Sequence, residues 1–580
     1  PDDPRIETDL KSAEDLADQL ALYKGRLHEP VQLILALGFY EEISRLIRCV
    51  GTYAGLMCQI DLRNEVLSAL EKRVEVRVRA IGNQIRFLAL EIGAMPATTF
   101  QGLMDKNPGL KQFTHCLQKT RAAHVHRLSE GEENLSADKD LSGKNVLESL
   151  FDIEFSGSDF QLQLPKPRMV TENEIRGLLR HPDRIMRQDA AAGLTKGLEE
   201  KKKRLGLIFQ GILRDCATED QHRGYQAPED RRNMSNELRD ATVDAMVKAV
   251  IANYGIVARY FQMKQQLLGF IDFYEWDRYA PLALRVEAPI YFKDTQRIVT
   301  EVFEQFDPDF GKIVRQAWNW LDAEPRPGKR SGGFCASIAP GVHPWVLVNF
   351  LGKVDDITTI AHEFGHAVHA VLSGEAAKNI NDYQPPVAIA EIASIFMESL
   401  TFDTLLASLS TKDRLAMLLQ RIDGTLATVF RQATMHRFEA ETHRLLRAQG
   451  SITTDEIGEI WQRLQREMHG RSVHFTDNHK LWWMYITHFF QYPFYVYSYS
   501  FGQLLAIALY RRYKEEGSAF VGQYKEILAA GGSKSPYNLF TPLGINLDDP
   551  SFWQGGLDYI SGLVTEAESL AKELGLLKTE

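Results

Sequence analysis

Two histidines four residues apart, with a glutamate directly after the first, are the residues that most directly suggest chemistry in this chain. On a helix His362 and His366 lie one turn apart, so both imidazoles project from the same side. Two imidazole nitrogens placed in this way can bind one zinc ion at roughly 2.0–2.1 Å. Glu363 lies about 100° further round the helix, where it can reach a metal-bound water. The pattern predicts a metal-activated water with a carboxylate base, which is the chemistry of hydrolysis.

A helix with solvated histidines is the alternative interpretation, because this short pattern is only moderately specific. A catalytic zinc ion also needs a third protein ligand and a free position for water. An HExxHxxGxxH site is excluded, since His369 and Leu372 occupy the positions of its glycine and last histidine. Glu391 is the better candidate, because coordinating a cation offsets the cost of burying its charge in an apolar run. A partly exposed carboxylate paired with Lys or Arg is the alternative for this residue.

Two polar residues that follow Glu391 could support a metal ligand. Ser394 and Glu398 lie three and seven residues further on, close to the same helical face. Hydrogen bonds from such neighbours orient the ligands of many metal sites. For Glu398 an ordinary surface position is an equally good interpretation. His369 is expected to pack or to form a hydrogen bond rather than to bind the metal.

Helical periodicity dominates the sequence. Apolar residues recur at three-to-four spacing in four long stretches, residues 31–57, 64–92, 195–216 and 234–268. The candidate ligands fall in two further patterns of this kind, a predicted HExxH helix at 356–373 and a predicted third-ligand helix at 386–408. We therefore predict a mostly α protein.

A glycine-rich stretch, GKRSGGFCASIAPGVHPWVLVNFLG, interrupts the helical pattern just before the histidine helix. It predicts a short hairpin or small sheet with strands within 333–338 and 345–350. A surface hairpin is one interpretation, and an edge strand beside a cleft is the other. In the second case Gly332, Gly333 and Phe334 would pair with an extended peptide, since glycine allows close approach of two backbones.

The bulk composition narrows the partners and the location. With 580 residues and 44% hydrophobic residues, the chain is long enough for two or more large sub-domains. Its net charge of -10 argues against nucleic acid and anionic membranes, which both need a basic surface. The uncharged stretch 481–510 is rich in tyrosine and contains Pro493, so we expect a buried segment rather than a membrane span. Five scattered cysteines and a start without a secretory pattern predict a cytoplasmic protein.

Several sequence blocks resemble oligoendopeptidase F and its thimet-type oligopeptidase relatives. They are HEFGHAVH, AEIASIFME, HFFQYPFYVYSYSFG, HRGYQAPEDRRN, MKQQLLG, WDRYAPL, GKRSGGF with PGVHPWVLVNF, and HRLSEGEENL. The resemblance covers most of the chain from about residue 115 onward. It implies a mostly α, two-lobed helical metallopeptidase with a deep substrate channel and a small β-sheet beside the active site. The expected domains are an N-terminal α-helical lobe at 1–190 and a catalytic domain at 191–580.

The resemblance also implies roles for individual residues. One Zn²⁺ per chain would be held by His362, His366 and Glu391, with Glu363 as the general base. By position, Tyr497 matches the family tyrosine that supports the oxyanion, and His488 matches the substrate-binding histidine. Tyr492 and Tyr495 would also face the substrate. A core aromatic with a bonded hydroxyl is an equally good interpretation of each tyrosine.

The predicted function is zinc-dependent hydrolysis of internal bonds in short unfolded peptides. A metallocarboxypeptidase or dipeptidyl carboxypeptidase on a related fold is an alternative that needs a cation to hold the terminal carboxylate, and Arg330 is the nearest one upstream of the motif. A non-catalytic peptide-binding protein with a structural metal is the third interpretation. Structural zinc sites usually have four closed ligands, and this interpretation leaves Glu363 unexplained. The sequence does not define the oligomeric state.

Overall fold

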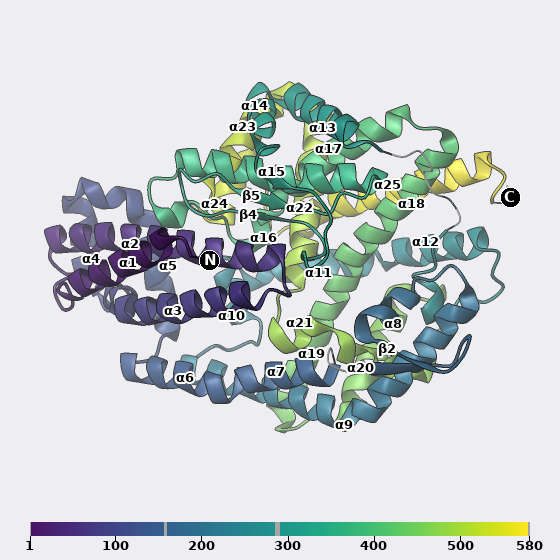
Figure 1. Cartoon of the computed structure of the whole chain (residues 1–580), viewed down its shortest axis with the longest axis horizontal. Coiled ribbons are helices and arrows are strands. Elements are labelled where there is room, and N and C mark those ends of the chain that lie inside the picture. Colours follow the sequence, from purple (N-terminus) through teal and green to yellow (C-terminus); the bar gives the residue numbers. More distant parts are fainter. Residues whose placement is uncertain (1, 156–158, 283, 285–289, 578–580) are drawn as a thin grey trace. The chain divides into compact units, whose positions relative to one another are not determined.

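The computed structural model describes residues 2–155, 159–282, 284 and 290–577. Helices contain most of these residues, from α1 (Pro4–Ala21) to α25 (Pro550–Glu573) (Figure 1). The strands that are described form two small sheets, one with two strands and one with three. The prediction of a mostly α protein with a small sheet is confirmed.

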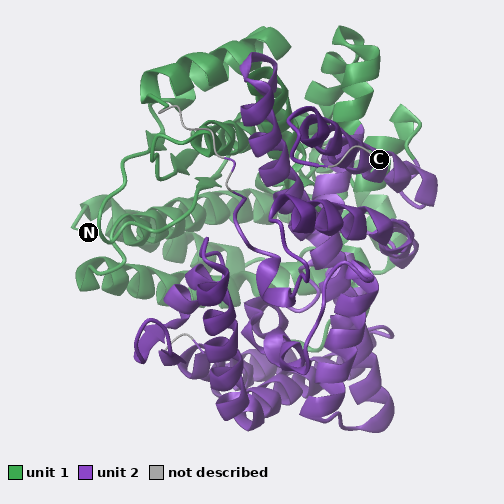
Figure 2. Cartoon of the chain, turned by 90° about the vertical axis from the view of Figure 1, so that its right-hand side faces the viewer, with its two compact units in different colours: residues 1–130, 288–405, 509–545 green, residues 131–287, 406–508, 546–580 purple. Residues whose placement is uncertain are grey.

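The chain divides into two compact units, and each unit draws on three separate stretches of sequence (Figure 2). Unit 1 comprises residues 1–130, 288–405 and 509–545; unit 2 comprises residues 131–287, 406–508 and 546–580. The predicted boundary after residue 190 falls inside α9 (Arg184–Arg223). A division into an N-terminal lobe and a catalytic domain stays a prediction.

Unit 1 begins with a bundle of long helices. The predicted helices at 31–57 and 64–92 are confirmed as α2 and α3. Asn64 fixes the start of α3, because its side chain accepts hydrogen bonds from the backbone N–H groups of Val66 and Leu67. Besides α1, the α-helices that lie wholly in unit 1 are α2 (Pro30–Ile60), α3 (Glu65–Ala94), α4 (Ala97–Lys106), α5 (Thr114–Ala122), α13 (Phe292–Phe306), α14 (Pro308–Ala317), α15 (Val354–Ala376), α16 (Val387–Ala390), α23 (Ser518–Ala530) and α24 (Pro536–Phe540).

The three-stranded sheet of unit 1 has the order β3-β5-β4. Antiparallel pairing of β4 (Phe334–Ala336) with β5 (Trp345–Leu347) confirms the predicted hairpin, and β3 (Leu321–Asp322) joins β5 in parallel. Both β4 and β5 pack against α15 (Figure 1). The sheet therefore lies beside the helix that carries the two histidines, with β4 at its edge.

Unit 2 is organised around α9, a helix of 40 residues that includes the predicted stretch 195–216. Its aromatic core holds Phe209, Phe438 and Trp483, all fully buried. The predicted stretch 234–268 is divided into three helices, because the backbone leaves the helical region at Glu237 and Asn253. Other elements of unit 2 are α6 (Glu130–Ser142), whose first residue belongs to unit 1, α7 (Lys144–Phe155), β1 (Asp159–Leu162), β2 (Arg168–Thr171), α8 (Glu172–Leu178), α10 (Asp230–Ser235), α11 (Asp240–Ala252), α12 (Tyr254–Leu267), α18 (Thr411–Leu426), α19 (Gln432–Gln449), α20 (Thr454–His469) and α21 (Thr487–Gln491).

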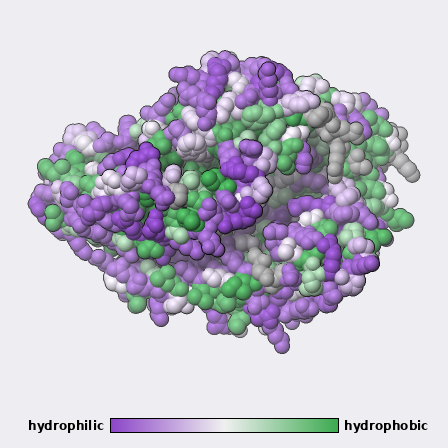
Figure 3. All heavy atoms as spheres, in the orientation of Figure 1, coloured by the Kyte–Doolittle hydropathy of each residue, from purple (hydrophilic) through white to green (hydrophobic). Residues whose placement is uncertain are grey.

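Two apolar stretches bear on the membrane question. The uncharged segment 481–510 forms the end of a 3₁₀ helix (Asp477–Tyr485), α21 and the start of α22 (Tyr497–Glu516), and most of its side chains are buried in the protein. Among the described residues, the stretch Asp240–Leu267 is long and apolar enough to cross a membrane, but 56% of its apolar 18-residue window is buried and the stretch packs against α20 and α25. Hydrophilic residues cover much of the face shown in Figure 3, with hydrophobic ones scattered between them.

Candidate metal centre and active site

Helix α15 positions His362, Glu363 and His366. Asp356 fixes the start of the helix by accepting hydrogen bonds from the backbone N–H groups of Leu351 and Lys353, at 2.7 and 2.9 Å. The apolar side of the helix is buried, and the ring of Phe364 packs edge-on against Trp318 at a centroid distance of 4.6 Å. The predicted helix at 356–373 lies within α15 (Val354–Ala376), and this packing fixes the rotation of α15 about its own axis.

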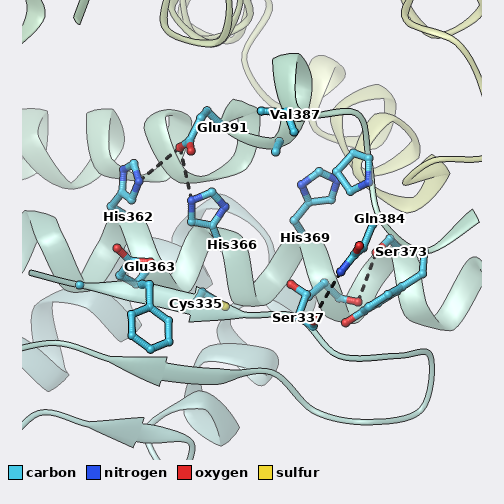
Figure 4. Close-up of a pocket in the computed structure, with 16 residues that line it drawn as sticks. Cys335, Ser337, His362, Glu363, His366, His369, Ser373, Gln384, Val387 and Glu391 are labelled. Atoms are coloured by element: carbon cyan, nitrogen blue, oxygen red, sulfur yellow. Dashed lines mark hydrogen bonds and ion pairs between the residues drawn. The ribbon is translucent and has the colours of Figure 1, made fainter. Parts of the chain in front are cut away.

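The third candidate ligand comes from a break in the next helical segment. The predicted helix at 386–408 is two helices, α16 and α17 (Ile392–Ser408), and Glu391 occupies the junction. Its carboxylate points toward both imidazole rings (Figure 4). One oxygen, Oε2, lies 3.3 Å from His362 Nε2 and 3.3 Å from His366 Nε2.

This group fits a zinc ion by its donor set and by its spacing. All three ligand atoms lie within 4.8 Å of one another. Ligands at about 2.05 Å from a tetrahedral zinc ion are separated from one another by about 3.3 Å. The two distances of 3.3 Å from nitrogen to oxygen have that value. Two imidazoles and one carboxylate also leave a coordination position for water.

Gly365 lets the two ligand-bearing segments approach closely. A Cβ atom at this position would lie 2.6 Å from Ala393 O and 2.6 Å from Ser394 Cα. Since side chains do not tolerate such contacts, only glycine allows α15 to cross α17 at this distance. The crossing places His366, the next residue of α15, beside Glu391. The role of Gly365 was not identified from the sequence, although this glycine lies within HEFGH.

The two predicted supporting residues contact the ligands. Ser394 Oγ donates a hydrogen bond to Glu391 Oε2 at 2.7 Å. Glu398 Oε2 lies 3.0 Å from His362 Nδ1. A hydrogen bond from Nδ1 to a carboxylate leaves Nε2 as the lone-pair nitrogen and fixes the ring plane. The structure thus brings Ser394 and Glu398 into the positions that supporting residues occupy.

The charges of the site reinforce this arrangement. Burial disfavours the charged form of Glu391, but hydrogen bonds from His362 and His366 outweigh it and hold the pKa of its carboxyl well below the ordinary value. Burial also disfavours protonation of His362, yet Glu391 and Glu398 raise its pKa well above the ordinary value. The ionised carboxylate of Glu391 therefore attracts positive charge to the space beside the two histidines, where a cation would be bound.

Glu363 faces the same cavity from the other side of the histidines. The cavity has a volume of about 460 Å³, and Gly333 and Phe334 of the β4 region also line it. Burial raises the pKa of the Glu363 carboxyl, and the charges of His362 and His366 oppose this shift. A Cβ atom at position 333 would lie 3.2 Å from Glu363 Oε1, so Gly333 keeps space beside the carboxylate.

The cavity continues beyond the metal group to a polar end that the sequence did not indicate. His369, Ser373 and Gln384 line this end (Figure 4). Gln384 Nε2 donates to Ser337 O at 3.3 Å. His369 is buried, and burial together with the charge of His366 lowers its pKa to about 4. It is therefore neutral, in agreement with a packing role.

The four predicted residues of the aromatic segment lie in unit 2. His488 is partly buried, and its Nε2 lies 3.2 Å from the hydroxyl of Tyr499, a residue that was not predicted. The rings of Tyr492 and Tyr495 lie 6.3 and 6.2 Å from the imidazole. His488, Tyr492, Tyr495 and Tyr499 form one cluster, which we call the His488 cluster.

Tyr497 differs from the other tyrosines of this segment. Its side chain is fully buried, and its hydroxyl accepts a hydrogen bond from Asn236 Nδ2 at 2.9 Å. This environment is that of a core aromatic with a bonded hydroxyl, the alternative that the sequence left open. Tyr499, two residues further on, is partly exposed and contacts His488. The spacing of the tyrosines alone did not separate these two positions.

Comparisons with known proteins agree with this site. The sequence profile of peptidase family M3 matches residues 178–559, and a profile described as oligopeptidase F matches residues 91–160. The chain is 23% identical to oligopeptidase PepF of Bacillus subtilis over 98% of this chain and 86% of that protein. It is 23% identical to an oligoendopeptidase F homolog of Lactococcus lactis over 92% of this chain and 89% of that protein.

Solved structures show the same fold. Oligoendopeptidase-F from Enterococcus faecium superposes with a TM-score of 0.76 at 19% identity, over 98% of this chain and 99% of that chain. A solved structure from Chlamydophila abortus gives a TM-score of 0.85 at 21% identity, over 97% of both chains. At such identities the likeness establishes the fold alone.

A pair of helical histidines, a carboxylate from a second helix and a buried glutamate in one cavity define a metallohydrolase of mostly helical fold. The chain belongs to peptidase family M3, because the sequence profile of that family matches more than half of its residues. This confirms the resemblance to oligoendopeptidase F and the prediction of a metalloendopeptidase.

Proposed function

We propose that this chain is a zinc-dependent endopeptidase that hydrolyses internal bonds of short, unfolded peptides. The observation that carries the proposal is the convergence of His362, His366 and Glu391 on one point, with Glu363 in the same cavity. Bound zinc would polarise the scissile carbonyl and lower the pKa of the attacking water. Other divalent ions also suit this donor set, so the choice of zinc belongs to the proposal.

Glu363 is the proposed general base. Its carboxylate is buried in the cavity, one residue from a ligand but directed to a different side of α15. It would take the proton of the attacking water and pass it to the leaving amine. Ser394 and Glu398 would hold Glu391 and His362 in place during this transfer, through the bonds described above.

Strand β4 is the proposed site for the peptide backbone. It lies at the edge of its sheet, and β5 is its neighbour on one side. Gly332 has a φ of +83°, and Gly333 has no side chain to obstruct an approaching chain. An extended peptide that adds to such an edge is held by backbone hydrogen bonds, which are independent of its sequence. Broad specificity follows.

The His488 cluster is the proposed source of hydrogen bonds to the peptide and to the oxyanion. His488, Tyr495 and Tyr499 are only partly buried, and each carries a polar group. Tyr497, which the resemblance placed in this role, would instead hold the segment through Asn236. Tyr499 is accordingly the tyrosine we propose for oxyanion support.

The cavity favours internal cleavage over removal of C-terminal residues. Of the described residues that line it, none is a lysine or an arginine. Arg330 lies over the ring of Phe334 at 5.6 Å and donates to Gln59 Oε1 at 3.1 Å. A carboxypeptidase needs a fixed cation for the terminal carboxylate, and the part of this cavity's lining that the structure describes does not provide one.

We place the protein in the cytoplasm as part of the same proposal. All five cysteines are free thiols, which agrees with a reducing compartment. The proposed partners are short peptides, and the net charge of -10 supports neither nucleic acid nor an anionic membrane.

Cleavage of a peptide blocked at both ends tests the proposal. Wild-type protein should cut an acetylated, amidated peptide internally, lose activity with a chelator, and regain it with Zn²⁺. E363Q should abolish cleavage while elemental analysis still finds about one zinc per chain. E375Q is the matched control, because Glu375 is exposed on the same helix. Release of C-terminal residues alone, or full activity of E363Q, would overturn the proposal.

A further inference from the structure

The Pro493–Phe494 turn, which lies between residues of the His488 cluster, has a strained backbone. Phe494 has a φ of +59°, a value that residues other than glycine rarely adopt. Its ring is buried, with 3% of its surface exposed. Tyr492 and Tyr495, the residues on either side of the Pro493–Phe494 turn, belong to the cluster. Because such a conformation persists only where its surroundings fix it, the contacts of Phe494 matter.

One face of α19 surrounds Phe494. Glu439 is fully buried, and its Oε1 accepts a hydrogen bond from the backbone N–H of Phe494 at 2.8 Å. The rings of His436 and His443 lie 5.9 and 4.8 Å from the Phe494 ring. The three side chains are spaced three and four residues apart, so they share one side of the helix. Their HxxExxxH pattern is not a metal group among the described residues, where only His362, His366 and Glu391 qualify.

Arg232 of α10 holds the same turn from another direction, and Asn236, the residue after α10, holds the residues that begin α22. The guanidinium of Arg232 donates through Nε and Nη2 to Pro493 O at 3.4 and 3.3 Å. It also lies 5.5 Å from the centroid of the Tyr495 ring. Asn236 donates to the hydroxyl groups of Tyr497 and Ser498, at 2.9 and 3.1 Å.

A carboxyl group is a costly means of filling this space. Burying it in an apolar core without bonds to both oxygens is unfavourable. Among the described residues, Glu439 Oε2 has no hydrogen-bond partner, and the bond to Phe494 is the contact that this side chain makes through Oε1. Leucine would fill the volume without this cost, but it would leave the N–H group of a strained residue unbonded. The carboxyl of Glu439 is therefore explained by the hydrogen bond that it accepts from the turn.

We propose that Glu439 and Arg232 are positioning residues, which fix the Pro493–Phe494 turn and thereby the orientation of the His488 cluster. Glu439 would hold the N–H group of Phe494, and Arg232 the carbonyl group of Pro493. The inference rests on the proposed function, since it assigns a catalytic task to the cluster that the turn orients. Neither residue would contact the reacting atoms.

Four variants test this inference. E439L removes the acceptor and keeps a side chain of similar size. E439Q keeps an acceptor oxygen and removes the ability to ionise. R232M removes the bonds to Pro493 from a second element. E441Q is the matched control on α19, because Glu441 pairs with Arg463 away from the turn.

Two measurements apply to every variant. Hydrogen exchange followed by mass spectrometry reports on amides 492–499 without reference to activity, and steady-state cleavage of the blocked peptide separates kcat from KM. For E439L we expect faster exchange at Phe494, by about tenfold for the loss of one buried hydrogen bond. We expect kcat to fall by about 10²-fold, as for a misplaced catalytic group, while KM and zinc content stay near wild type. E439Q should restore both values, and R232M should move both in the direction of E439L.

The outcomes are distinct. Wild-type exchange across 492–499 in E439L and R232M would overturn the inference, and so would faster exchange with unchanged kcat. If E439L does not fold, R232M measured against E441Q decides by the same two criteria. A wild-type protein that does not cleave the blocked peptide would defeat the proposed function instead, and the exchange data would still show whether Glu439 holds the turn.

Discussion

At the scale of single residues, the site depends on which atom each side chain presents. Glu391 offers one oxygen to both imidazoles, and Ser394 donates to that same oxygen. His362 has its Nδ1 engaged by Glu398, which leaves Nε2 to face Glu391. The ligand residues could be predicted from the sequence, because zinc binds imidazole nitrogen and carboxylate oxygen. The atom that each residue presents depends on side-chain torsions, which the spacing does not determine.

The bond between Glu398 and His362 gives the first prediction. E398Q keeps the shape of the side chain but removes its charge, so it should weaken the orientation and the basicity of the His362 ring. Affinity for zinc should fall by about 10-fold, at the lower end of the range for such partners. Competition with a chromophoric chelator measures this directly. E375Q should bind zinc as tightly as wild type, and equal affinity in E398Q would contradict the role given to Glu398.

Two tyrosines in the aromatic segment give the second prediction. Tyr499 contacts His488, whereas the hydroxyl of Tyr497 is enclosed and bonded to Asn236. Y499F should therefore lower kcat by about 10²-fold, the effect of losing one oxyanion donor, with zinc content unchanged. Y497F should leave kcat within a few-fold of wild type and lower the thermal midpoint, because it leaves Asn236 with one hydroxyl partner fewer. Peptide cleavage and thermal unfolding of both variants separate these roles, and the reverse ranking would return the role to Tyr497.

At the scale of elements, the close crossing of α15 and α17 decides whether the ligands meet. The sequence predicts both helices, since their apolar residues recur with helical spacing. It does not predict the distance between them, which depends on Gly365 lying opposite Ala393. The division of 234–268 into three helices was likewise missed, because an apolar pattern continues through the turns at Glu237 and Asn253.

Gly365 gives the third prediction. In G365A the new methyl group would meet Ala393 O at 2.6 Å, so α15 and α17 must separate. Overpacking of this kind costs typically about 1–3 kcal/mol of folding free energy, and Glu391 would move away from the histidines. Both the thermal midpoint and the zinc affinity should fall. G424A in α18 is the control, because a Cβ atom there meets nothing within 4 Å, and alanine in a helix should be neutral or stabilising. Wild-type zinc affinity in G365A would refute the argument.

At the scale of the whole molecule, each unit is assembled from three stretches that are far apart in sequence. Helix periodicity is local, so it predicts elements without showing which of them pack together. The resemblance to a family supplied the fold, while the structure brings the candidate ligands, which lie within residues 362–391, close to one another. Because the two units interleave along the sequence, local patterns show no single boundary between them, and the division at residue 190 stays a prediction.

The buried acid of α19 links the positioning of the turn to the stability of the whole chain. Burial raises the pKa of Glu439 from 4.5 to about 8, and the hydrogen bond from Phe494 and the charge of Arg232 oppose this shift. The folded protein therefore holds a proton here between pH 4.5 and about 8 that the unfolded chain releases. The stability that this proton confers is fully present below pH 4.5 and is lost as the pH rises to about 8.

E439Q cannot lose this proton, which gives the last prediction. Relative to wild type, its free energy of unfolding should increase with pH across that window, by at most about 1.4 kcal/mol per pH unit. All other groups titrate equally in both proteins, so the difference isolates position 439. Urea denaturation at pH 5, 6, 7 and 8 measures it, and E441Q should show a constant difference from wild type. A constant difference for E439Q as well would mean that Glu439 is already ionised in the folded protein, and its bond to Phe494 would then be that of a buried carboxylate.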